Sequence, residues 1–209
     1  MKKILVTQRL ILNKDYYELR EALDVNWGIL FEKINFLPII LPIEYNFEKY
    51  FKSIDIDGII LTGGNDLDII NKNEISKKRD LYEKNLIKYA IKNDIPVFGF
   101  CRGMQIIAEF FGADFYEVKN QINTKHKLKV NKDSKYFNLL NRIDKVNSFH
   151  NYGIKSISDD ILISATNEDG IIKAIEHKKM NIFGQMWHTE RGNEISEKEL
   201  NLVRVFFND

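Results

Sequence analysis

The 209-residue sequence contains a single cysteine, Cys101, and only four histidines. A chain with one cysteine cannot form an intramolecular disulfide, so nothing in its composition requires an oxidising compartment. The cysteine and histidines also form no clustered set of ligands along the chain. We therefore expect neither a metal ion nor a cofactor.

An excess of charge of one sign is also absent. Lysine and arginine total 31 and aspartate and glutamate total 30, so the net charge is +1. This balance gives no electrostatic argument for nucleic acid or an anionic membrane as a partner. No apolar run is long enough to span a bilayer, and the short run at residues 4–6 ends at Thr7 without a signal-peptide cleavage site. We expect a cytoplasmic protein that binds a small molecule, and the sequence leaves its oligomeric state open.

No linker, internal repeat or low-complexity tract divides the chain. Hydrophobic residues make up 44% of the sequence, which is enough for a sizeable core. The length is typical of one domain. We therefore expect a single domain over residues 1–209.

Apolar runs and helical periodicity alternate in the first half of the chain. The pattern predicts strands at residues 3–6, 37–43, 58–61 and 97–100, and helices at residues 15–33, 79–93 and 102–111. Such alternation favours an α/β fold with a mostly parallel, doubly wound sheet flanked by helices. The second half adds β-rich runs, some expected to be antiparallel, at residues 125–130, 145–148, 161–166, 171–176 and 181–186. A helix at residues 195–207 is predicted to close the fold.

Cys101 lies where a predicted strand passes directly into a predicted helix, between Gly99 and Gly103. A sharply bent turn needs small neighbours, and these two glycines make the segment a cysteine form of the nucleophile elbow, G-x-C-x-G. The elbow would lift the sulfur above the carboxyl end of the sheet and place it at a helix N-terminus, which favours the thiolate. A lone cysteine is more often a small buried hydrophobe, but the paired glycines favour a nucleophile.

A cysteine nucleophile needs a base, and the base needs a group that orients it. His188 directly follows an apolar run, and Glu190 comes two residues later, so both can project from the same side of an extended strand end. The other three histidines lack this setting, and two of them we interpret as structural: His126 and His177.

The oxyanion formed by the attack needs backbone donors that already point toward it. Residues 58–61 end in a diglycine turn that can present bare N–H groups. We predict that the N–H groups of Gly64 and of Arg102, the residue after the nucleophile, form this oxyanion hole. On its own the diglycine would be read as an ordinary turn.

Six segments together resemble the class I glutamine amidotransferase superfamily, and within it the γ-glutamyl hydrolase branch of the peptidase C26 type. They are V-T-Q-R at residues 6–9, D-G-I-I-L-T-G-G-N-D at 57–66, R-D-x-x-E at 79–83, G-x-C-R-G-x-Q at 99–105, V-N-S-x-H at 146–150 and W-H-T-E at 187–190. The departure is Thr189, where the family usually has proline. This change concerns backbone stiffness and leaves Cys101, His188 and Glu190 in place.

The resemblance implies a thioester route, in which Cys101 attacks a γ-glutamyl carbonyl and His188 protonates the leaving nitrogen. Water then releases glutamate. The resemblance also implies which residues hold the γ-glutamyl substrate, partly through their backbone: Gly63, Asn65, Gln105, Ser148, Phe149 and His150. For His150 a structural hydrogen bond is an equally good interpretation. For the R-D-x-x-E residues the alternatives are a role in shaping the pocket and a solvated helix face with local ion pairs: Arg79, Asp80 and Glu83.

Three functions remain open at this point. The first is a stand-alone γ-glutamyl hydrolase of unidentified leaving amine, for example of the γ-glutamyl-γ-aminobutyrate type. The second is a glutaminase that supplies ammonia to a separate synthetase, which the shared triad cannot distinguish from the first. The third is a catalytically inactive relative that serves as a binding module, and the presence of all three triad residues argues against it.

Overall fold

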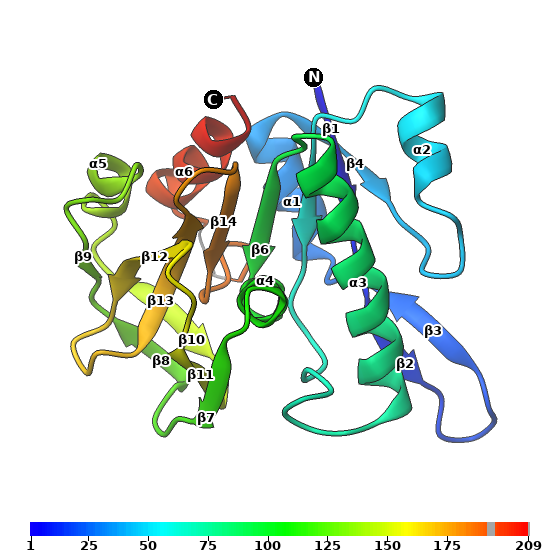
Figure 1. The fold of residues 1–209 in the computed structure, drawn as a ribbon, viewed down its shortest axis with the longest axis horizontal. Helices are drawn as coiled ribbons and strands as arrows, with labels where there is room; N and C mark the ends of the chain where they lie inside the picture. The colour runs from blue at the N-terminus through cyan, green and yellow to red at the C-terminus, as the bar shows by residue number, and fades with distance from the viewer. Residues whose placement is uncertain (192–194, 209) are drawn as a thin grey trace.

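The computed structural model describes residues 1–191 and 195–208 (Figure 1). Its centre is an eight-stranded sheet with the order β4-β1-β5-β6-β14-β13-β12-β9. The first five of these strands pair in parallel: Phe36–Ile40, Lys2–Val6, Gly58–Leu61, Val97–Phe100 and Ile182–Gln185. Numbered along the chain, they follow the order 2-1-3-4-5 of a flavodoxin-like, doubly wound fold.

Antiparallel strands extend the sheet beyond β14. They are β13 (Ile172–His177), β12 (Ile161–Thr166) and β9 (Lys129–Val130). Two small antiparallel sheets lie beside this end: β8 (Ile122–His126) with β10 (Val146–Phe149), and β7 (Asp114–Glu117) with β11 (Tyr152–Ser156). The expected combination of a parallel sheet with antiparallel strands in the second half is confirmed.

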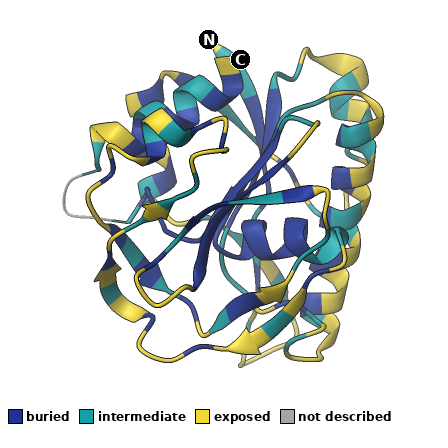
Figure 2. Cartoon of the chain, turned by 60° about the vertical axis from the view of Figure 1, so that its left-hand side comes forward, coloured by how far each residue is buried: buried dark blue, intermediate teal, exposed yellow. Residues whose placement is uncertain are grey.

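Helices cover both faces of the sheet. One face packs against α1 (Asn26–Ile34), α5 (Phe137–Leu140) and α6 (Glu197–Asn208). The other packs against α3 (Glu74–Lys92) and α4 (Arg102–Phe110), with α2 (Glu48–Ser53) beside them. The strands and the inner faces of the helices are buried, whereas exposed residues lie on the outer helix faces and loops (Figure 2).

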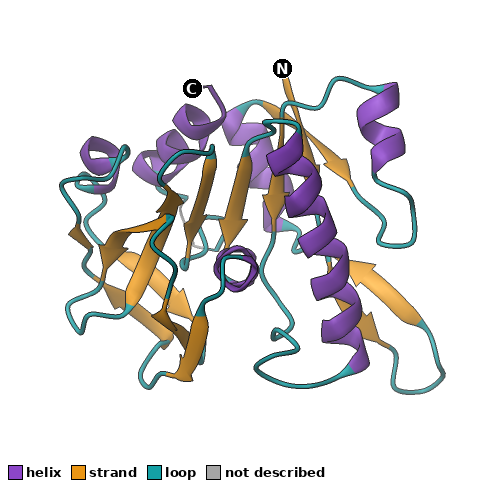
Figure 3. Ribbon diagram, in the orientation of Figure 1, coloured by secondary structure: helices purple, strands orange, loops and turns teal. Residues whose placement is uncertain are grey.

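The parallel strands fix where a site can form. The arrowheads of β6 and β14 point to the same edge of the sheet, where their carboxyl ends lie (Figure 3). Because β5 is parallel to β6, the diglycine turn that follows it emerges at this edge as well. Cys101, the diglycine turn and the segment that carries His188 are therefore brought to one edge.

The helix predicted at residues 15–33 is wrong over its first part. This stretch contains β3 (Leu19–Ala22), which forms a hairpin with the preceding strand β2 (Arg9–Leu12), and the helix begins only at Asn26. One of the apolar residues whose spacing suggested a helix does not face the core, since Tyr16 is 57% exposed. Pairing with β2 satisfies the backbone of β3, and this tertiary contact outweighs the local periodicity.

Other boundaries also differ from the prediction. The run at residues 125–130 belongs to two strands, β8 and β9, in different sheets. Helix α3 begins five residues earlier than expected, because the Asn73 side chain caps it by accepting a 2.8 Å hydrogen bond from the Ser76 N–H. The short elements α2, α5, β7 and β11 were not predicted. Across the described residues, no helix combines the length and apolar character needed to cross a membrane.

Candidate active site

Cys101 sits directly between β6 and α4, at the N-cap position of the helix. Its backbone has φ 51° and ψ −105°, a conformation that a residue with a side chain rarely adopts. The bend requires close approach of α4 to β5, because a Cβ on Gly103 would collide with the carbonyl oxygen of Leu61. Cys101 is only 7% exposed. These features are those of a nucleophile elbow.

His188 and Glu190 follow β14 and are almost completely buried. His188 Nδ1 lies 2.6 Å from Glu190 Oε1. The Asn147 side chain fixes the loop that carries them, since its Oδ1 accepts a 2.8 Å hydrogen bond from the His188 N–H and its Nδ2 donates to the carbonyl oxygens of His188 and Arg191. The imidazole therefore has one nitrogen held by a carboxylate and the other free to face Cys101.

The electrostatics of the pair favour charge separation between sulfur and imidazole. Burial by itself would raise the pKa of the Cys101 thiol, but the charge of His188 and its hydrogen bond lower it below the usual value. Burial would likewise lower the pKa of His188, yet Cys101 and Glu190 raise it to about 9. The arrangement thus stabilises a thiolate beside an imidazolium.

The diglycine turn after β5 is held open by a buried arginine. Arg79 Nη1 donates to the carbonyl oxygens of Gly63 at 3.1 Å and Gly64 at 2.6 Å, and Nη2 donates to that of Thr62 at 2.9 Å. Because the carbonyls point toward Arg79, the N–H groups of the turn are left for another acceptor. Gly64 has φ +82°, which suits glycine.

The R-D-x-x-E residues are buried, so the interpretation as a solvated helix face is wrong. Arg79 and Glu83 are at most 1% exposed and pair at 3.0 Å. The Arg102 side chain, equally buried, forms ion pairs with Asp80 and Glu83. This network ties α3 to the first turn of α4 and so fixes the backbone N–H of Arg102, one of the two predicted oxyanion donors.

A cavity of about 240 Å³ opens over the sulfur. Eight of the residues singled out in the sequence line it: Gly64, Asn65, Cys101, Arg102, Gln105, Phe149, His150 and His188. Gly63 lies against the other side of the triad, where an added Cβ would be 2.8 Å from His188 Cε1. The Ser148 hydroxyl faces the core and donates to Gln121 Oε1 at 3.2 Å, so only its backbone is available to a ligand. Among the described residues, no group of His, Cys, Asp and Glu side chains is placed to hold a metal ion.

A buried lysine that the sequence patterns do not single out supports this cavity. Lys173 in β13 is fully buried, and its Nζ lies 2.7 Å from Gln121 Oε1, 2.9 Å from Ser148 Oγ and 2.8 Å from His150 Nε2. Burial and the neighbouring charge of Lys173 lower the pKa of His150 to about 3, so this imidazole is neutral. Its Nε2 accepts from Lys173, and its Nδ1 donates to the carbonyl oxygen of Tyr152 at 3.0 Å. A lone lysine inside the apolar run at residues 171–175 was the signal available in the sequence.

Sequence similarity places the chain in a family. The family model of peptidase C26 matches residues 20–190. The chain belongs to the peptidase C26 family. A γ-glutamyl-CDP-amidate hydrolase from Campylobacter jejuni is 41% identical over 198 residues, which cover 93% of each chain. A glutamine-hydrolysing GMP synthase component from Picrophilus torridus is 34% identical over 145 residues, which cover 66% of this chain and 70% of the relative.

The fold is likewise that of glutamine amidotransferases. The crystal structure of a glutamine amidotransferase from Thermotoga maritima superposes with a TM-score of 0.67 over 99% of this chain and 84% of that chain, at 18% identity. The α/β architecture with a flavodoxin-like parallel sheet is therefore shared with this group of proteins.

Thr189, the departure from the usual peptidase C26 motif, has a structural role of its own. Its hydroxyl accepts a 2.9 Å hydrogen bond from Gln185 Nε2 and donates to Glu199 Oε2 at 2.9 Å. The side chain thus ties the loop of His188 and Glu190 to β14 and α6. Hydrogen bonds take over the restraint that proline would give through its ring.

Proposed function

We propose that this peptidase C26 member hydrolyses a γ-glutamyl amide bond through a thioester on Cys101. The observation that carries the proposal is the thiol at a strained elbow beside an imidazole that is itself held by Glu190 at 2.6 Å. The proposed substrate is γ-glutamyl-CDP-amidate, because the Campylobacter jejuni hydrolase named for it is 41% identical over 93% of this chain. The products would be L-glutamate and cytidine diphosphoramidate, for modification of a capsular polysaccharide, with the reaction taking place in the cytoplasm.

The first half of the reaction forms the thioester. The Cys101 thiolate attacks the γ-carbonyl carbon, and the carbonyl oxygen becomes an oxyanion. The N–H groups of Gly64 and Arg102 are the proposed donors to this oxyanion, and one such donor is typically worth about 3 kcal/mol of transition-state stabilisation. The His188 imidazolium then gives its proton to the leaving nitrogen, the C–N bond breaks, and the thioester remains.

The second half reverses these roles. His188, now neutral, accepts a proton from a water molecule as the oxygen attacks the thioester carbonyl. The C–S bond breaks and the Cys101 thiolate is restored, so one water is consumed and one glutamate is released. Glu190 keeps the imidazole oriented and stabilises its charged form in both halves.

The 240 Å³ cavity is the proposed site of the glutamyl group. Gln105 Nε2 donates to the carbonyl oxygen of Tyr152 at 3.1 Å, and the Asn65 side chain is held by the backbone of Leu10 at 2.9 Å, so both walls are ordered before a ligand arrives. Phe149 and His150 complete the lining. Preordered walls lower the entropic cost of binding a small, flexible substrate.

The test compares glutamate release from γ-glutamyl-CDP-amidate, γ-glutamyl-γ-aminobutyrate and free glutamine by kcat/KM, for the wild type and Cys101→Ala. We expect the nucleotide substrate to be preferred and the variant to be inactive on all three. The exposed Lys88→Met on α3 is the control and should match the wild type. Glutamate release by purified Cys101→Ala would refute the mechanism.

A glutaminase is the second candidate, favoured by the 34% identity to a glutamine-hydrolysing GMP synthase component. Such a protein would hydrolyse free glutamine efficiently, and a synthetase partner would raise the rate further. A preference for glutamine over both substituted amides in the same panel would select this function. Slow alkylation of Cys101, no faster than that of a free thiol, would favour an inactive binding module.

A further inference from the structure

A second cavity, of about 910 Å³, opens beside the triad. It shares His188, Phe149 and Arg191 with the smaller cavity over the sulfur. Its volume is within the range of about 300–1,000 Å³ that is usual for small-molecule sites. A substrate that fills both cavities would have its scissile bond at their junction, beside the imidazole that protonates the leaving nitrogen.

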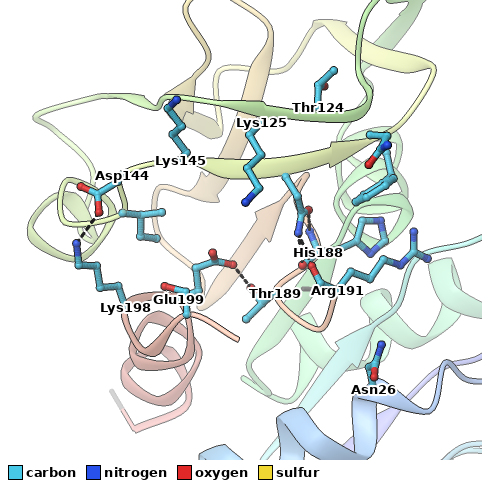
Figure 4. A pocket seen from close by; sticks show the side chains of 15 residues that line it. Asn26, Thr124, Lys125, Asp144, Lys145, His188, Thr189, Arg191, Lys198 and Glu199 are labelled. Carbon is cyan, nitrogen blue, oxygen red and sulfur yellow. Dashed lines mark hydrogen bonds and ion pairs between the residues drawn. The ribbon is translucent and has the colours of Figure 1, made fainter. Parts of the chain in front are cut away.

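One wall of the large cavity is a face of the β8–β10 sheet. Lys125 of β8 is the paired neighbour of Asn147 on β10, and paired residues of antiparallel strands project from the same face. Residues two apart share a face as well, so Lys145 and Phe149 lie on the side of Asn147. Because Asn147 binds the backbone of His188, this face looks onto the triad. Figure 4 shows the Lys125 side chain extending from β8 into the cavity.

The cavity lining carries a net positive charge, even after the residues that neutralise each other in an ion pair are set aside. It contains four basic residues, Lys125, Lys145, Arg191 and Lys198, and two acidic ones, Asp144 and Glu199. Lys198 Nζ lies 2.9 Å from Asp144 Oδ2, so these two neutralise each other (Figure 4). The Glu199 carboxyl is buried, which raises its pKa to about 7 and keeps it partly protonated near neutral pH.

Two of the remaining cations are not held in a close ion pair, although the charge of Lys125 partly opposes the effect of burial on the pKa of the Glu199 carboxyl. Within residues 1–191 and 195–208, neither Lys125 nor Lys145 takes part in an ion pair. Arg191 contacts Glu190 only at 3.7 Å and stacks over the Phe149 ring, with its guanidinium carbon 5.6 Å from the ring centroid. These groups are available to a ligand that carries negative charge close to the triad.

We infer that this basic cavity binds the leaving group and that it selects a nucleoside diphosphate, with Lys125, Lys145 and Arg191 as the phosphate-binding residues. The inference rests on the proposed function, which places a phosphorus atom directly on the leaving nitrogen. The phosphates must then lie within a few bond lengths of His188, in the cavity that these three cations line. A neutral leaving amine would have no negative charge for these three cations to bind.

The test uses two substrates with the same γ-glutamyl group. One is γ-glutamyl-CDP-amidate and the other is γ-glutamyl-p-nitroanilide, whose leaving group is uncharged. Lys125→Met, Lys145→Met and the double variant are compared with the wild type by kcat/KM, and Lys88→Met is the matched control outside the cavity. Lys125→Arg with Lys145→Arg restores the charge without restoring the original side chains.

We expect each methionine variant to lose about tenfold in kcat/KM on the nucleotide substrate, the usual worth of a charged hydrogen bond, and to stay near the wild type on the anilide. The arginine variants should recover most of the loss. Rising salt should weaken only the nucleotide reaction. Equal losses on both substrates, or no loss on either, would overturn the inference while leaving the thioester mechanism intact.

Inhibition separates this inference from the proposed substrate. Cytidine diphosphate should compete with the anilide in the wild type, and about tenfold less well in each methionine variant. If the wild type hydrolysed the anilide but not γ-glutamyl-CDP-amidate, the proposed substrate would be wrong, whereas inhibition by cytidine diphosphate that depends on the lysines would still support the anionic subsite. Absence of this inhibition would overturn the subsite itself.

Discussion

Cys101 combines an unfavourable backbone with a favourable charge environment. The positive φ of 51° costs conformational energy, of the order of 1–3 kcal/mol for such residues, which the surrounding packing must offset. In return the sulfur is held beside His188 at the N-terminus of α4. Local strain and a shifted pKa at the same residue are typical of a reactive group rather than of a core cysteine.

Because Cys101 is stabilised as a thiolate, its rate of alkylation should depend on pH in a characteristic way. The rate of iodoacetamide modification should follow an apparent pKa below that of a free cysteine, because His188 outweighs the effect of burial. In His188→Asn burial and the charge of Glu190 should outweigh the smaller effect of Arg191, so the apparent pKa should move above the free value. Mass spectrometry across a pH series measures both. A wild-type profile with the pKa of a free thiol would contradict the assignment of an ion pair.

At the scale of elements, the site depends on how closely α4 approaches the sheet. The helix has no linker before it, and Gly103 faces the carbonyl of Leu61 in β5 without room for a methyl group. The ion pairs from Arg102 to Asp80 and Glu83 hold the same turn from the side of α3. The position of the nucleophile is therefore set by β5, α3 and α4 together.

Gly103→Ala should disturb this arrangement. The added methyl group meets the backbone of Leu61, so α4 must shift, and we expect a loss of about 1–3 kcal/mol of stability together with most of the activity. Gly28→Ala is the control, because Gly28 lies in helix α1 with open space around it, and it should stabilise by about 0.5–1 kcal/mol. Urea denaturation measures both. Equal stability of Gly103→Ala and the wild type would show that the elbow tolerates the side chain.

The elements predicted best are those whose local sequence pattern indicates the same structure that their packing in the fold requires. The strands at residues 58–61 and 97–100 match β5 and β6, because short apolar runs between turn residues are fully buried central strands. The prediction for residues 15–25 failed because β3 is made by pairing with β2, which the apolar spacing of that stretch does not show. The sequence also left open whether Arg79 and Glu83 are buried. Their burial depends on ion pairing with each other and with Arg102, which belongs to another helix.

At the scale of the whole molecule, we propose that the chain unfolds as one domain. The eight-stranded sheet runs through both halves of the sequence, from β1 to β14. Thermal unfolding followed by calorimetry and by circular dichroism should therefore give one transition at one midpoint. Two resolved transitions would show that the antiparallel part, β9 with β12 and β13, folds separately.

The ionisation of Glu199 should make the free energy of unfolding depend on pH. Burial raises its pKa in the folded protein to about 7, above the ordinary value of 4.5, so the folded state binds more protons between these two pH values. Stability from this group is therefore complete below pH 4.5 and is lost as the pH rises through 7. Glu199→Gln, which keeps the acceptor for Thr189, should be more stable than the wild type by about 2–3 kcal/mol at pH 8.

The matched measurement is the same pair of proteins at pH 4.5, where wild-type Glu199 is protonated. There the difference in unfolding free energy should disappear. A gain of the same size at both pH values would mean that packing rather than ionisation separates the two side chains.

The fold class and the residue types of the candidate site follow from local sequence patterns. Three such patterns are the glycine spacing around Cys101, the i+2 spacing of His188 and Glu190, and the diglycine turn. In each, the residues that indicate the chemistry lie within a few positions of one another. The distant groups that support these residues are seen only in the folded chain. Lys173 contacts His150 from 23 residues away, and Asn147 holds His188 from 41 residues away. Such contacts arise from the packing of strands far apart in the chain, which no local pattern records.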